Sequence, residues 1–174
     1  NLQAANAMNL IEVNVSGTTT STNGLINISG GGYSGLVRSN CCKVTIESAA
    51  VIRAGVTAGN NGIEISDSTV EGDLTAANNP IVLTNVAMNA GNISAGQNNV
   101  TITGGVINAN IPNAHRIFVY DGAQINGDLK ARYEVRLNSS VVEGNVETTA
   151  DHDGLHHVYM TDSFVYGNVI VRSD

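Results

Sequence analysis

The fold is decided by the stretch Val-Glu-Gly-Asp-Leu-Thr-Ala at residues 70–76, where apolar and polar residues alternate around one glycine. The pattern returns as Ile-Asn-Gly-Asp-Leu-Lys-Ala at 125–131 and as Val-Glu-Gly-Asn-Val-Glu-Thr at 142–148. Looser copies occupy 88–95 and 165–171. Alternation with a period of two is typical of strands, so the pattern predicts a repeated strand rather than a repeated helix.

A second apolar pair of the form I-x-I precedes each copy. Its first members are Ile26, Val44, Ile63, Ile81, Val100, Ile117, Val135 and Val158, with gaps of 18, 19, 18, 19, 17, 18 and 23 residues. A repeat of about 18 residues is too short for a strand plus a crossover helix, and a fixed period places equivalent residues above one another. The sequence therefore predicts an all-β protein, a parallel β-helix of about eight coils, right-handed by the rule for parallel crossovers.

The repeat covers nearly the whole chain, so we expect one β-helix domain over residues 1–174. Within it, 1–24 would form an N-terminal cap and first coil, 25–171 the regular coils, and 150–157 an inserted loop that explains the 23-residue gap. No capping segment follows the last repeat, which suggests either a longer protein or end-to-end self-association, because open strand edges attract partners.

Parity within the coils separates inward from outward positions. We expect four aliphatic ladders inside, with Gly72, Gly127, Gly144 and Gly167 at inward positions where a narrow coil has little room. The ladders run Val44/Ile63/Ile81/Val100/Ile117/Val135/Val158, Ile46/Ile65/Leu83/Ile102/Val119/Leu137/Met160, Val70/Met88/Ile107/Ile125/Val142/Val165 and Val56/Leu74/Ile93/Ile111/Leu129/Val146/Val169. Such a core leaves no room for a cofactor, and we expect none inside it.

Composition narrows the function classes. The net charge of −7 argues against nucleic acid as a partner, and the short apolar runs argue against membrane insertion. The scarcity of lysine favours a secreted or cell-surface protein, and a chain that begins at Asn1 suggests processing. For Cys41 and Cys42 we expect one buried thiol and one at a turn, because adjacent cysteines rarely bond to each other.

The inserted loop concentrates three of the four histidines with two aspartates. Histidine and carboxylate side chains together are competent ligands for zinc or a similar divalent metal. The loop therefore suggests a metal site, and a plain solvated loop is the alternative. The candidate ligands are Asp151, His152, Asp153, His156 and His157.

Aromatic side chains gather in the last three coils. Alternation along each strand is expected to place four side chains on the outside, those of Phe118, Tyr120, Tyr159 and Tyr166. Phe118, Arg136 and Tyr159 fall in one column, one in each successive coil. Exposed rings in a row often mark a contact surface. We interpret these five residues as a candidate contact site for a protein or glycan surface.

A column of Asn and Asp accompanies the glycines. It contains Asp73, Asn92, Asn110, Asp128, Asn145 and Asn168, and we expect it to bond from coil to coil. A catalytic alternative pairs Asp128 with Glu143 one coil away, at a separation that glycoside hydrolysis could use.

The V-x-G-x-[LIV]-x-[AT] segments over about residues 44–171 resemble those of bactofilins, the polymer-forming bacterial cytoskeletal β-helices, and of bacterial surface proteins and autotransporter passengers. The surface-protein resemblance implies a non-enzymatic structural or adhesive module. A carbohydrate-active lyase or hydrolase is one alternative. A bactofilin-like cytoskeletal polymer, which would be cytoplasmic, is the other.

Overall fold

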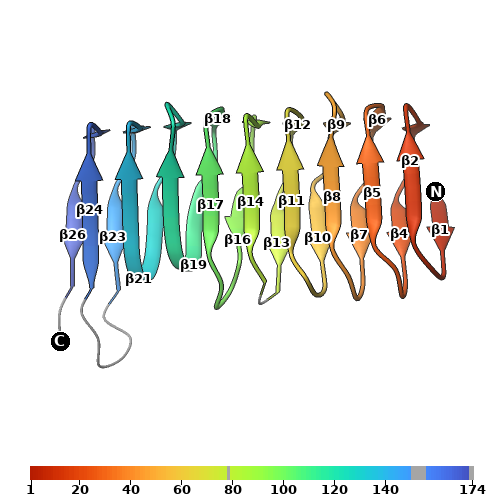
Figure 1. Ribbon diagram of the computed structural model, residues 1–174, viewed down its shortest axis with the longest axis horizontal. Coiled ribbons are helices and arrows are strands. Elements are labelled where there is room, and N and C mark those ends of the chain that lie inside the picture. Colours follow the sequence, from red (N-terminus) through yellow and green to blue (C-terminus); the bar gives the residue numbers. More distant parts are fainter. Residues whose placement is uncertain (78, 150–155, 173–174) are drawn as a thin grey trace.

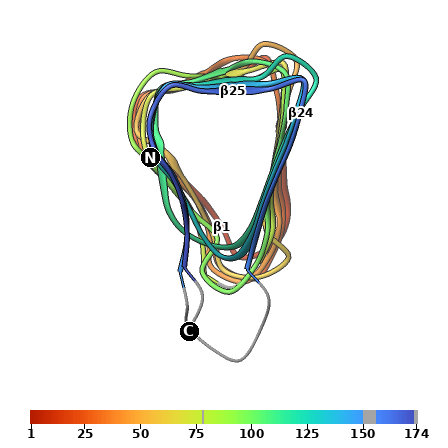
Figure 2. The same ribbon diagram turned by 90° about the vertical axis from the view of Figure 1, so that its left-hand side faces the viewer.

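The chain forms an all-β parallel solenoid of about eight turns with a repeat of about 18 residues. The computed structural model describes residues 1–77, 79–149 and 156–172. Each coil runs through three short strands, and the coils lie side by side along a rod (Figure 1). Viewed along the rod, they superimpose as a triangle (Figure 2). We call its three sides faces A, B and C.

Faces A and B carry the longer strands. Face A contains β1 (Leu2–Ala4), β4 (Thr19–Ser21), β7 (Val37–Ser39), β10 (Val56–Ala58), β13 (Leu74–Ala76), β16 (Asn92–Ser94), β23 (Val146–Thr148) and β26 (Val169–Val171). Face B contains β2 (Met8–Ile11), β5 (Ile26–Ser29), β8 (Val44–Glu47), β11 (Ile63–Ser66), β14 (Ile81–Thr84), β17 (Val100–Thr103) and β24 (His157–Thr161). Two long strands, β19 (Asn110–Tyr120) and β21 (Leu129–Asn138), pass from face A to face B without interruption.

Face C consists of two-residue strands. They are β3 (Asn14–Val15), β6 (Gly32–Tyr33), β9 (Val51–Ile52), β12 (Thr69–Val70), β15 (Ala87–Met88), β18 (Val106–Ile107), β20 (Gln124–Ile125), β22 (Val141–Val142) and β25 (Phe164–Val165). The first strands, β1 and β2, pair in parallel with β4 and β5, so residues 1–24 stack in the same way as the coils that follow.

Register and burial confirm the inward ladders. Ile63, for example, lies opposite Val44 on one side and Ile81 on the other, and all three are at most 1 % exposed. The ladder positions in the last coil are more open, and Met160 is 41 % exposed. Branched aliphatic side chains fill the triangle, which makes the rod a rigid scaffold with a continuous apolar core.

The corner between faces B and C has a left-handed residue at the same place in every described coil. These residues have φ between 46° and 69° and are Glu12, Gly30, Ser48, Asp67, Asn85, Gly104, Asp121, Ser139 and Asp162. Gly, Asn and Asp tolerate this conformation best, which explains why the corners are rich in them. Asp67, Asp121 and Asp162 occupy three of these corners.

The repeated glycines have a different cause from the one expected. Gly144 is half-buried, and a Cβ atom built on it would strike the carbonyl group of Gly127 in the preceding coil. Gly72, Gly127 and Gly167 likewise face the backbone of the preceding coil. The obstacle is therefore main chain one coil away, and not crowding by core side chains.

The cysteines differ from the expectation of two thiols. Cys41 and Cys42 form a disulfide with each other at the corner between β7 and β8. Ser39 Oγ accepts a hydrogen bond from the backbone N–H of Cys42 (3.0 Å), so the chain turns tightly there and brings the two adjacent side chains together. Both side chains are half-buried.

The Asn/Asp column is a hydrogen-bonded ladder, as predicted. Asn110 Oδ1 accepts the backbone N–H of Asp128 (2.9 Å), and Asp128 Oδ1 accepts that of Asn145 (2.7 Å). Asn145 Oδ1 in turn accepts the backbone N–H of Asn168 (2.9 Å). Each side chain thus satisfies a main-chain donor of the next coil, at the corner where face C ends.

Candidate functional site

Four of the five predicted contact residues lie where β19, β21 and β24 run side by side on face B. Register places Phe118 opposite Arg136 and Arg136 opposite Tyr159, so the three occupy one column of successive coils. Inward neighbours such as Val135 and Leu137 are buried, which turns the column to the outside. The predicted column is therefore present, on a sheet whose far side is fixed by the core.

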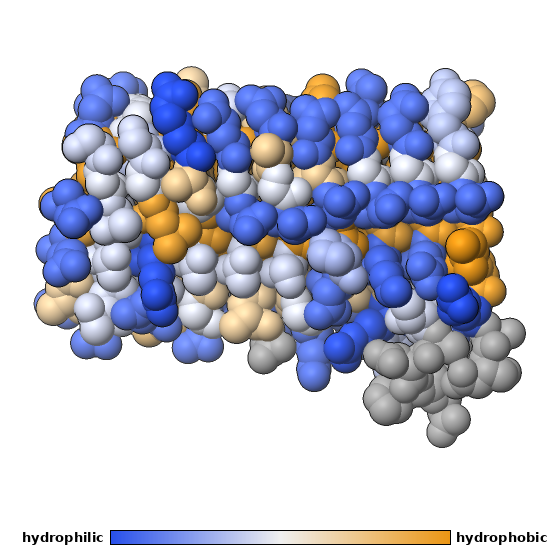
Figure 3. All heavy atoms as spheres, turned by 180° about the vertical axis from the view of Figure 1, so that it is seen from behind, coloured by the Kyte–Doolittle hydropathy of each residue, from blue (hydrophilic) through white to orange (hydrophobic). Residues whose placement is uncertain are grey.

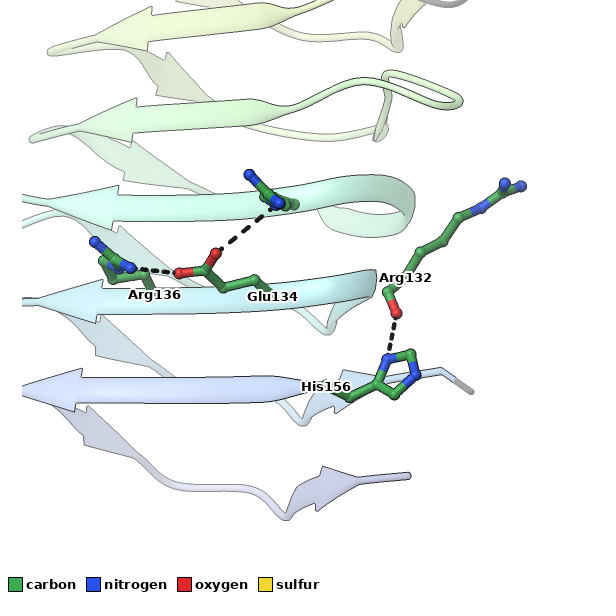
Figure 4. A network of polar contacts seen from close by, with 5 residues as sticks. Arg132, Glu134, Arg136 and His156 are labelled. Carbon is green, nitrogen blue, oxygen red and sulfur yellow. Dashed lines mark hydrogen bonds and ion pairs between the residues drawn. The ribbon is translucent and has the colours of Figure 1, made fainter. Parts of the chain in front are cut away.

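Glu134 organises the charges beside this column (Figure 4). Its carboxylate accepts a hydrogen bond from Arg136 Nη2 (2.7 Å) and lies 3.8 Å from Nε of Arg116 in the preceding coil. The Glu134 side chain is only 14 % exposed, whereas both arginines are about half exposed. One shielded carboxylate thus holds two guanidinium groups on the surface of face B.

The aromatic rings continue this surface. The Arg136 guanidinium lies 5.2 Å from the centre of the Tyr159 ring, within the range of a cation–π contact. Phe118 and Tyr120, two residues apart on β19, have nearly parallel rings with centres 6.3 Å apart. Tyr159 is 45 % exposed. We call Phe118, Tyr120, Arg136 and Tyr159 the face B patch.

The fifth predicted contact residue, Tyr166, does not belong to this patch. It follows β25 on face C, where its backbone N–H donates a hydrogen bond to Val142 O (2.9 Å), and the residue is 72 % exposed. The structure therefore brings together four of the five predicted contact residues. Tyr166 stands apart on another side of the rod.

Of the predicted metal ligands, Asp151, His152 and Asp153 lie outside the described residues. His156 is 8 % exposed, and its Nδ1 lies 2.8 Å from the carbonyl oxygen of Arg132. The His157 ring lies 5.2 Å from that of Tyr159. Within the described part of the chain no group of three His, Cys, Asp or Glu side chains could hold a metal. The metal site stays a prediction.

A row of three rings crosses the corner between faces A and B. The Tyr133 ring lies 4.5 Å from that of His115 and 5.9 Å from that of His156. Burial lowers the pKa of His115 below its ordinary value, and the positive charges of Arg116 and Arg132 lower it further. This row was not predicted from the sequence, although the three residues are spaced by one coil each once the inserted loop is discounted.

A groove of about 470 Å³ follows the Asn/Asp ladder on face A. Asn110, Asp128 and Asn145 line one side, and Ile111 and Leu129 contribute to its apolar floor. Glu147, which also lines the groove, pairs with Lys130 (3.8 Å) and Arg172 (2.8 Å). Figure 3 shows a hydrophilic row along the rod with a hydrophobic band beside it. The sequence predicted the ladder but gave no sign of the groove.

The protein is a parallel β-solenoid, and the face B patch and the groove on face A both lie in the C-terminal half of its chain. No protein-family model matches the chain, and no curated protein or solved structure is significantly similar to it. Across residues 1–77, 79–149 and 156–172, no helix has the length and hydropathy that a membrane crossing would require.

Proposed function

We propose that the protein is a non-enzymatic contact module of an exported bacterial protein, a rigid rod that presents the face B patch to a partner surface. The observation that carries the proposal is the registered column of Phe118, Arg136 and Tyr159 on consecutive strands. Tyrosine and arginine are, together with tryptophan, the residues enriched among those that dominate binding energy at interfaces. A rigid sheet holds them in place before a partner arrives, which lowers the entropic cost of binding.

Two further observations support this assignment. The carboxylates of Asp73 and Asp128, which could otherwise suggest chemistry, hold backbone N–H groups of the following coil at 2.8 and 2.7 Å. The disulfide between Cys41 and Cys42 favours an oxidising compartment, since such bonds persist mainly in exported proteins. Both fit a structural module at the cell surface better than a cytoplasmic enzyme.

The test is adhesion. Beads coated with the protein are offered to panels of purified matrix proteins and purified polysaccharides, beside beads coated with the double variant Arg136→Ala/Tyr159→Ala. Tyr166→Ala is the matched control, because it removes an exposed ring outside the patch. We expect adhesion to at least one panel member that only the double variant loses. Wild-type beads that bind nothing, or that bind as the double variant does, would contradict the proposal.

A polymer-forming role of bactofilin type is the second candidate, and the repeated V-x-G-x-[LIV] segments support it. Its test is negative-stain microscopy of the purified protein at high concentration. Filaments that lengthen with concentration would favour this role, and discrete rods would exclude it. The face B patch favours the contact role, because rings on a side face add nothing to stacking along the rod axis.

A further inference from the structure

The two rings in the column of the face B patch have a spacing that follows from the strand spacing of the solenoid. Phe118 and Tyr159 occupy the same column with Arg136 between them, so their strands are two coils apart. At about 4.8 Å for each coil, their main-chain positions are separated by about 10 Å along the rod axis. A ligand that contacts both rings must therefore extend along the rod axis over about this length. A ligand whose own units recur at about this length would meet both rings in the same way.

From this spacing we propose that the face B patch binds a neutral, extended β-1,4-linked glycan that lies along the rod. This inference rests on the contact function proposed above and names the class of partner. In such a glycan each sugar advances by nearly the length of one coil. Every second sugar presents the same face, so its repeat is close to two coils. Sugars one and three of a run can then cover Phe118 and Tyr159 while sugar two lies over Arg136.

Other extended ligands do not match the repeat. A peptide strand advances about 3.3 Å per residue, so its same-face side chains recur at about 6.6 Å and fall out of step with the coils. Chains with α-1,4 or β-1,3 linkages curl, and cannot keep contact with two rings on a straight column. The distance between the two rings therefore favours one linkage geometry, in addition to favouring sugars over peptides.

The polar groups of the patch suit the middle sugar. The guanidinium of Arg136 and the carboxylate of Glu134 are planar and ion-paired at 2.7 Å, so they offer donors and acceptors side by side to neighbouring hydroxyl groups. Arg116 and Arg136 share the single charge of Glu134, and the local excess is therefore one positive charge. An excess this small favours a neutral glycan over a polyanion.

The direct test is binding of defined oligosaccharides by titration calorimetry. The probes are β-1,4-linked glucose and N-acetylglucosamine oligomers of two, three and six units, with β-1,3-linked and α-1,4-linked glucose hexamers as linkage controls. Covering roughly 60 Å² of ring and sugar surface at a second contact should raise affinity about tenfold. We expect that rise between two and three units, because only the third sugar reaches the second ring.

Variants locate the site. Phe118→Ala and Tyr159→Ala should each reduce trisaccharide affinity to that of the disaccharide, and Tyr166→Ala should leave it unchanged. Tyr159 is the primary test, because the residue is 45 % exposed and its replacement leaves the core intact. Absence of β-1,4 binding, equal affinity for the linkage controls, or an equal effect of Tyr166→Ala would overturn the inference. Patch-dependent adhesion to a protein, without glycan binding, would overturn it while leaving the contact function in place.

Discussion

The Asn/Asp ladder makes a sharp prediction at Asp128. Asp128 Oδ1 accepts two hydrogen bonds from Asn145, one from its backbone N–H (2.7 Å) and one from Nδ2 (3.0 Å). Asp128→Ala removes both acceptor contacts. Asp128→Asn retains a side-chain oxygen in the same position, as Asn110 and Asn145 do in their own coils.

The expected magnitude follows from charge and exposure. A hydrogen bond to a charged group contributes about 1.5–3 kcal/mol net. Asp128 is exposed, so water replaces part of what the alanine variant loses, and we expect about 1.5 kcal/mol. The asparagine variant keeps the hydrogen bond and loses only the extra strength that the charge of the carboxylate gives it. Its free energy of unfolding should therefore stay within about 0.5 kcal/mol of the wild-type value.

Amide hydrogen exchange is the suitable assay, because repeat proteins open in local units and a global melting curve averages over them. The amide of Asn145 should exchange about tenfold faster in Asp128→Ala, since about 1.4 kcal/mol corresponds to a factor of ten. Amides on face B should be unchanged. Equal exchange at Asn145 in the wild type and both variants would refute the role of the ladder, and so would equal acceleration in the two variants.

Three further substitutions test separate features. Gly144→Ala should cost about 1–3 kcal/mol in urea unfolding, because the added methyl group meets main chain of the preceding coil; an unchanged midpoint would contradict this. Ser139→Asn should raise stability by about 0.5–1 kcal/mol, because Asn suits a φ of 50° and can donate a hydrogen bond to the preceding coil, as Asn85 does to Asp67 (3.2 Å). The melting temperature measures the effect, and a lower melting temperature than that of the wild type would contradict it. Folding lowers the pKa of His115, so its contribution to stability should be present at pH 7.5 and decline as the pH falls through the ordinary histidine range. His115→Gln should therefore flatten that part of the plot of urea midpoint against pH. Identical plots for the two proteins would exclude the effect.

The ladders and the aromatic column could be predicted because both follow from periodicity alone. Once Val135 is known to point inward, Arg136 must point outward, and a fixed repeat places it between Phe118 and Tyr159. The corners follow the same repeat, since Asp121 occupies in its coil the position that Asp67 and Asp162 occupy in theirs. These features depend on the order of residues and on strand spacing, both of which the sequence contains.

Features that depend on exact distances between particular side chains could not be predicted in the same way. The second contact of Glu134, to Arg116, depends on how two long side chains bend toward each other. The disulfide between Cys41 and Cys42 depends on a tight local turn that sequence spacing does not indicate. The right-handed sense of the coil, the metal site and the biological role stay predictions, because none follows from period or parity.

Glycan binding at the face B patch is tested most directly by an NMR footprint of a bound β-1,4-linked hexasaccharide on the isotopically labelled protein. We expect shift changes confined to face B, centred on Phe118, Arg136 and Tyr159, and unchanged signals from the side-chain amides of Asn110 and Asn145 in the groove on face A. Shift changes centred on that groove, or no shift changes at saturating oligosaccharide, would contradict it.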